Sequence, residues 1–174
     1  SPMKAGLLRY LAFILVVAGL ALAVGAGGWL YYHSLVANPG AETLPEVLVG
    51  LPRTQALTGR LAVQEINHLH GLNFAITSGG VGAYGQQQII VWVSGSPLDF
   101  MARRMQDEMN LRIAEGRSPF TVLETQQVDG RTVQALEGLG QQHYYFRSGR
   151  RLVWLAADAA LAEQALVEAL AFYP

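Results

Sequence analysis

The longest hydrophobic run of the chain lies near its N-terminus. From Leu11 to Leu30 the sequence reads LAFILVVAGLALAVGAGGWL, twenty residues without a charged side chain. A helix that rises about 1.5 Å per residue needs this length to cross roughly 30 Å of hydrocarbon. The run ends in WLYY at 29–32, and such aromatic residues are typical of membrane interfaces. The pattern predicts a transmembrane helix over residues 11–32.

A cleaved signal peptide is the alternative for the same run, because ALA at 21–23 resembles a cleavage site. The length of the run favours an uncleaved anchor, since the apolar core of a signal peptide usually spans about 7 to 15 residues. Lys4 and Arg9 precede the run, so the positive-inside rule places residues 1–10 in the cytoplasm. We expect a single-pass protein of the cell membrane, with the rest of the chain in the periplasm or outside the cell.

Small residues recur within the predicted membrane helix. Gly19, Ala23 and Gly27 are spaced four apart, so they line one side of the helix and let a second helix approach closely. Lipid gives helices no hydrophobic drive to associate, which makes such close packing important. The stripe predicts integral membrane protein subunits as partners, in addition to the lipid bilayer. The alternative is that glycine and alanine are simply frequent in membrane helices.

After the membrane segment, the pattern predicts a linker and then three helices. Residues 33–57 contain three prolines and no regular period, which is typical of a linker. The first helix is expected over 58–70, with Thr58 as its N-cap and Gly71 following its last residue.

Two later helices are marked by candidate caps. Ser96, followed by Pro97, is expected to cap a second helix that ends before Gly116. Asp158 is expected to cap a final helix that runs to the end of the domain.

Between these helices the sequence predicts strands. NFAIT at 73–77 and GVGAYG at 80–85 read as extended, and QIIVWVS at 88–94 reads as a buried strand. Asp129-Gly130 and Ser148-Gly149 each separate two strand-like runs, the signal of a two-residue hairpin. We therefore expect residues 58–174 to form an α+β domain, an antiparallel sheet of about six strands covered by about three helices mainly on one face.

The domain shows weak self-similarity. An offset of 62 residues aligns Tyr84 with Phe146 and Trp92 with Trp154. The order strand, turn, strand, helix then occurs twice, and a duplicated ββα unit is the corresponding hypothesis.

GVGAYG also matches the G-x-G-x-x-G pattern of dinucleotide-binding loops. Such a loop must lead into a helix, whose N-terminus holds the pyrophosphate. Here the glycines lead into the predicted strand at 88–94 and not into a helix. The segment is better explained as an extended stretch entering a hairpin, so nucleotide is not expected as a partner.

Charge and composition exclude further classes of function and of site. Two of the twelve basic side chains precede the membrane run, which leaves ten basic against thirteen acidic residues in the remaining chain. A net negative domain has no electrostatic reason to bind nucleic acid. The chain has no cysteine, which excludes disulfides and thiolate metal sites.

Histidines are weak candidates for a metal site. His68 and His70 are two apart, so on a helix they point in nearly opposite directions and cannot chelate together. His143 would have to join them through the fold. The simpler explanation for His70 is a favourable position near a helix C-terminus, so no cofactor and no metal are predicted.

A cluster of arginines marks a candidate partner or anion patch. Arg147, Arg150 and Arg151 surround the second hairpin, and Tyr144 precedes them. These side chains could contact an acidic partner or an anionic ligand. The alternative is an ordinary solvated turn.

The sequence therefore favours a non-enzymatic, membrane-anchored accessory or assembly subunit of a membrane protein complex. No G-x-S-x-G, H-E-x-x-H or Walker sequence is present, and no pair of carboxylates stands out as an acid–base couple. The alternative function is a tethered ligand-binding or sensing domain outside the cytoplasm. A hydrolase whose site is assembled from dispersed residues comes third.

Overall fold

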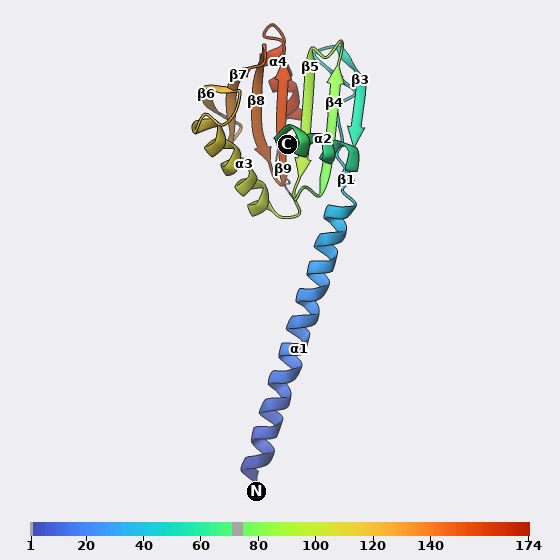
Figure 1. The fold of residues 1–174 in the computed structure, drawn as a ribbon, viewed down its shortest axis with the longest axis vertical. Coiled ribbons are helices and arrows are strands. Elements are labelled where there is room, and N and C mark those ends of the chain that lie inside the picture. The colour runs from blue at the N-terminus through green and yellow to red at the C-terminus, as the bar shows by residue number, and fades with distance from the viewer. Residues whose placement is uncertain (1, 71–74) are drawn as a thin grey trace. The chain divides into compact units, whose positions relative to one another are not determined.

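The structure is a computed structural model that describes residues 2–70 and 75–174. It divides into two compact units, residues 1–37 and 38–174. The first unit is the single helix α1 (Pro2–Ala37), drawn in blue in Figure 1. It extends beyond the predicted span at both ends. It stops two residues before Pro39, as expected because proline disfavours helical backbone in the residue that precedes it.

The second unit is built on one nine-stranded sheet (Figure 1). The strands follow the order β2-β3-β4-β5-β9-β8-β7-β6, and every pair along this path is antiparallel. The short strand β1 pairs with β4 in parallel. The strand bounds are β1 Gly40–Ala41, β2 Val47–Leu48, β3 Leu51–Thr58, β4 Ser78–Tyr84, β5 Ile89–Gly95, β6 Thr121–Val128, β7 Arg131–Gly138, β8 Gln141–Ser148 and β9 Arg151–Ala157. The α+β class is confirmed, with nine strands in place of the expected six.

Three of these strands lie in the segment 33–57 that the sequence assigned to a linker. The strap, residues 42–48, is fixed to the domain by burial of Leu44 and Leu48. The hydroxyl of Tyr84 donates to the Pro45 carbonyl oxygen at 2.9 Å. The segment lacks a strand pattern because β3 lies near the sheet edge and has no buried position, so neither of its faces requires the regular apolar alternation of a half-buried strand.

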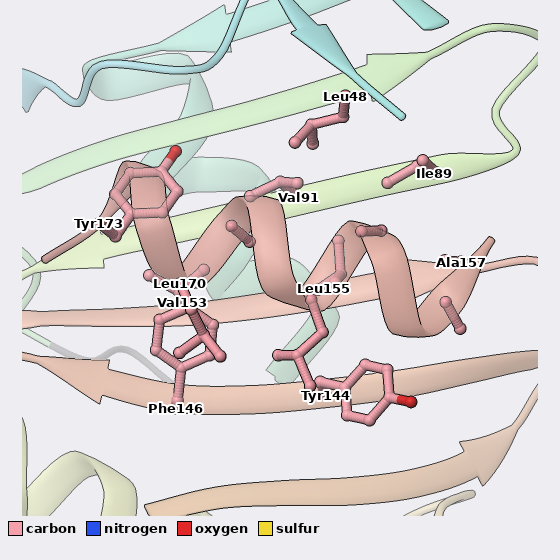
Figure 2. Packing of buried hydrophobic residues seen from close by; sticks show 14 of the residues in the cluster. Leu48, Ile89, Val91, Tyr144, Phe146, Val153, Leu155, Ala157, Leu170 and Tyr173 are labelled. Carbon is pink, nitrogen blue, oxygen red and sulfur yellow. The ribbon is translucent and has the colours of Figure 1, made fainter. Parts of the chain in front are cut away.

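Helices cover both faces of the sheet. Their bounds are α2 Arg60–His70, α3 Asp99–Ala114 and α4 Ala162–Phe172. α4 packs against Val91, Val153 and Leu155, as Figure 2 shows. α2 and α3 pack on the opposite face, where their apolar side chains join Trp92 and Trp154. The expectation of helices mainly on one face is wrong, because β5 and β9 are apolar at nearly every position and a strand of that kind is buried on both sides.

The three helices of the domain begin later than the predicted caps. Thr58 is the last residue of β3. Ser96 donates its backbone N–H to the Arg150 carbonyl oxygen at 2.9 Å, which continues the sheet before α3 begins. Asp158 lies in the turn that precedes α4, and its carboxylate accepts from Gln141 at 3.1 Å. In each case the residue takes part in sheet or turn contacts and does not cap the helix. Gly71, expected after the first helix, lies outside the described residues.

The predicted hairpins are largely confirmed. β4 and β5 form one, so GVGAYG runs along β4 into a turn, where Gly85 has a φ of +60°. Asp129 and Gly130 both have positive φ, at 49° and 75°. The other turn is shifted by one residue, since Ser148 pairs with Arg151.

The self-similarity extends to the strands but not to the helices. Trp92 and Trp154, aligned by the sequence offset, are direct cross-strand partners in the β5–β9 pair. The two hairpins flank this pair in the order β4-β5-β9-β8. However, α3 and α4 pack on opposite faces, so the chain does not form two equivalent ββα units.

The end of α4 is held by Arg131. Its guanidinium donates to the carbonyl oxygens of Leu170, at 3.1 Å, and of Tyr173. It also lies 5.7 Å from the ring centre of Phe146. A cation at this point satisfies the last carbonyl groups of the helix and suits its dipole.

We expect Arg131→Met to lower the free energy of unfolding by about 2 kcal/mol, because hydrogen bonds from a charged donor are lost at a half-buried position. Chemical denaturation followed by tryptophan fluorescence measures this change. The control is Arg117→Met, which removes an exposed ion pair with Glu115 and should cost less than about 0.5 kcal/mol. Equal losses in the two variants would contradict the role given to Arg131.

Candidate functional site

The small-residue stripe lies along one side of α1, and this side is uncovered. α1 contains a stretch, Tyr10–Ala37, of 28 residues with a mean hydropathy of 2.4, long and apolar enough to cross a membrane. The most apolar part of this stretch has no buried residue in the structure. At Gly19 and Gly27, apart from the adjoining residues and the backbone of the helix itself, no heavy atom lies within 4 Å of the point where a Cβ would stand. The stripe is therefore accessible to another helix.

Aromatic side chains gather near the end of α1. The Trp29 ring lies 4.4 Å from the His33 ring and 6.4 Å from the Tyr32 ring, measured between centroids. Trp29 is 63% exposed. A cluster of this composition suits the region between lipid tails and water, because each ring carries an apolar body and a polar edge.

The arginine hairpin is tied to two other segments of the domain, residues 97–99 at the start of α3 and the strap. Arg147 lies 2.6 Å from the Asp99 carboxylate at the start of α3. Arg150 donates to the Pro97 carbonyl oxygen at 2.9 Å. Arg151 donates to the Glu42 carboxylate at 2.8 Å.

These contacts reduce the charge that the hairpin offers to a ligand. Glu42 is more deeply buried than Arg151, with 10% of its side chain exposed against 47%, and it also accepts from Ser78. Arg150 is exposed and its recorded contact is to an uncharged carbonyl. Among the three predicted arginines, Arg150 is thus the best placed for an external anion.

Tyr144 does not belong to the same surface. It is 3% exposed and packs in the core beneath α4, where Figure 2 shows it beside Leu155. Its hydroxyl accepts a hydrogen bond from Gln142 at 2.7 Å. Arg147 instead contacts the start of α3 on the other face. Alternation along β8 separates the two residues.

His143 lies in an aromatic cluster that sequence reasoning did not detect. The indole Nε1–H of Trp154 donates to His143 Nδ1 at 3.0 Å, and His143 Nε2 lies 3.0 Å from the Gly138 carbonyl oxygen. Phe120 meets the imidazole edge to face, with centroids 4.7 Å apart. Tyr145 stacks on Trp154 at 5.1 Å. The sequence signal was the run of four ring-bearing residues at 143–146 in β8 together with Trp154 in β9, and only the register pairs them.

The contacts fix the protonation of His143. Because Nδ1 accepts from an indole N–H, the proton of the neutral ring sits on Nε2 and is donated to Gly138. Burial lowers the pKa of His143 below its ordinary value of 6.5, an effect that the Gly138 carbonyl partly offsets. Both ring nitrogens are in use, so His143 serves the packing of the cluster rather than a metal.

Of the other two predicted metal ligands, only His68 has a described side chain. His68 is exposed on α2, and the side chain of His70 lies outside the described residues. Within residues 10–69 and 75–174, no group of three or more histidine and acidic side chains is arranged to hold a metal ion.

The described part of the domain contains a small void and a wider groove. A void of about 20 Å³, room for about one water molecule, lies between α2, α3 and the sheet, beside Ile66, Trp92 and Met105. A wider groove of about 540 Å³ lies where β6 and β8 begin and β7 ends. Its lining mixes polar and apolar residues, among them Pro119, Leu123, Glu137 and Gln141.

The His143 contacts predict a specific loss of stability in acid. The folded state favours the neutral ring, so the contribution of His143 is complete above pH 6.5 and is lost as the pH falls toward the lowered folded pKa. Melting temperatures of the wild type and of His143→Gln, measured between pH 7.5 and 5, should converge as the pH falls. His68→Gln removes an exposed histidine and should keep the wild-type profile. Parallel profiles for the wild type and His143→Gln would contradict the assignment.

Comparisons with known proteins give no relative. No family model matches this chain, and neither a curated protein nor a solved structure matches it significantly. No relative therefore assigns a role to the stripe of α1, the arginine hairpin or the His143 cluster.

Proposed function

We propose that this chain is a non-enzymatic, single-pass membrane-anchored accessory or assembly subunit of a membrane protein complex. The proposal depends on one observation: α1 contains a long apolar stretch, Tyr10–Ala37, whose large apolar side chains are exposed. An apolar helix of this length is stable in a bilayer and would be costly to leave in water. By the positive-inside rule, Lys4 and Arg9 keep the N-terminus in the cytoplasm, and residues 38–174 lie outside it.

The stripe of Gly19, Ala23 and Gly27 gives this anchor a surface for a partner helix. Glycine lets two backbones approach closely, and the gain comes from van der Waals contact over the length of the stripe. At Gly19 and Gly27 the space that a partner would fill is open. The domain's own reactive side chains, by contrast, serve structural contacts at His143, Arg147 and Arg151.

Substitution of the stripe tests the proposal. Gly19→Leu combined with Gly27→Leu should lower the amount of bound partner subunit at least tenfold, because two isobutyl groups fill the space required for close approach of the helices. The measurement is the amount of co-migrating protein on a native gel after mild detergent extraction, with identification by mass spectrometry.

Gly25→Leu provides the matched control. Gly25 is also open, but it lies on the opposite side of the helix from Ala23, because two residues correspond to about 200°. This variant should keep the partners. If the double variant retains every partner, or if Gly25→Leu disrupts binding equally, the stripe is not the contact surface.

A tethered ligand-binding domain is the second candidate, and the groove beside Leu123 and Gln141 favours it. Its volume of about 540 Å³ is within the range of about 300–1,000 Å³ found for small-molecule sites. A thermal-shift screen of the chain against metals, nucleotides, lipids and sugar phosphates tests this function. A ligand that raises the melting temperature should lose its effect in Gln141→Ala if it binds in the groove. A screen in which no compound raises the melting temperature counts against this candidate.

A further inference from the structure

Charge is distributed unevenly between the two ends of the sheet. We define the β1 end as the edge where β1, β4, β7 and β9 begin and β3, β5, β6 and β8 end. The charged side chains described on the strap, strand ends, turns and helix starts there are Arg60, Arg103, Arg131, Arg147, Arg150 and Arg151, with Glu42, Asp99 and Asp129. Residues 38–174 contain ten arginines and thirteen carboxylates. The remainder of the unit thus has four arginines against ten carboxylates, so the β1 end is basic within an acidic domain.

Exposed apolar side chains accompany these arginines. Leu98 and Phe100, at the start of α3, are 51% and 59% exposed. Leu57 and Leu61, where β3 leads into α2, are also exposed. Basic residues beside protruding apolar ones suit the surface of a bilayer, where headgroups meet the charge and the apolar side chains reach the acyl boundary.

Chain connectivity holds this same end close to α1. Only Asn38 and Pro39 lie between the last residue of α1 and Gly40, the first residue of β1. Three Cα–Cα steps span at most about 11 Å. Wherever the two units lie relative to one another, the start of β1 therefore stays within that reach of the end of α1.

We propose that the β1 end of the domain docks on an anionic lipid surface, with Arg60 and Arg150 facing headgroup phosphates and Leu98 and Phe100 entering the interface. The inference rests on the proposed function, because the tether places this end at a bilayer only if α1 spans one. Arg150 is exposed beside the Pro97 carbonyl that it contacts, and Arg60 is exposed at the first position of α2. Docking fixes the orientation of the domain above the membrane and turns the more acidic remainder of the domain away from it.

The absence of cysteine from the sequence allows a single fluorescent label to report docking in the full chain. Thr58→Cys carries the label at the β1 end, and Gln86→Cys carries it in the β4–β5 turn at the other end; both positions are exposed. The chain is reconstituted in vesicles of phosphatidylcholine alone or with one quarter phosphatidylglycerol. Headgroup spin-labelled lipid should quench the Thr58 label at least twofold more in the anionic vesicles, while the Gln86 label stays unchanged.

A matched pair of charge reversals tests which arginine acts. Each arginine near an anionic surface contributes a factor of about five to partitioning, so Arg150→Glu should reduce docking at least fivefold. Arg117→Glu makes the same charge change near the end of α3, away from the β1 end, and should leave the signal as in the wild type. Raising the salt concentration to about 0.5 M shortens the Debye length and should weaken docking with the sequence left unchanged.

The outcomes separate the two proposals. Vesicles are first washed with alkaline carbonate, which removes proteins that do not span the bilayer. Release of the chain overturns the proposed function and the docking with it. Retention of the chain with equal quenching in both lipids, and with no effect of Arg150→Glu or salt, overturns docking alone. Quenching that requires anionic lipid and Arg150 supports docking.

Discussion

The antiparallel pairing of β5 with β9 is the contact on which the rest of the domain depends. It joins the hairpin β4–β5 to the hairpin β8–β9, which are distant in sequence, and places Trp92 opposite Trp154. Val91, Val93, Val153 and Leu155 in these strands have no exposed surface. Because side chains alternate between the faces, two strands that are apolar on both sides create two hydrophobic surfaces, and each must be covered. α4 covers one, and α2 with α3 cover the other.

The two outer parts of the sheet pack on either side of the β5–β9 pair. On one side the strap lies over the core through Leu44 and Leu48 and through its contacts with Tyr84 and Tyr173. On the other side β8 brings His143 and Tyr145 beside Trp154, where Phe120 completes the cluster. Polar groups in these regions are satisfied within the domain, since no buried side-chain nitrogen or oxygen among the described residues lacks a hydrogen-bond partner. Such complete pairing is typical of a well-packed domain interior.

The functional proposals use the parts that remain outside this packing. α1 has an exposed apolar surface with an open glycine stripe, and the β1 end of the sheet carries exposed arginines and apolar side chains. In these proposals the first surface is assigned to hydrocarbon and the second to lipid headgroups. In that arrangement the more acidic remainder of the domain is turned away from the membrane.

The sequence by itself determined the elements whose signals are local. A continuous apolar run predicts α1, and glycine-containing turns predict the hairpins at Asp129 and Gly85, because φ preferences act within a few residues. The face covered by each helix, the pairing of Trp92 with Trp154 and the environment of His143 were decided only by tertiary structure. So were the contacts of Arg147 and Arg151 and the placement of the strap in the sheet. These features depend on strand order and register, which join residues tens of positions apart, and no local pattern encodes such partners.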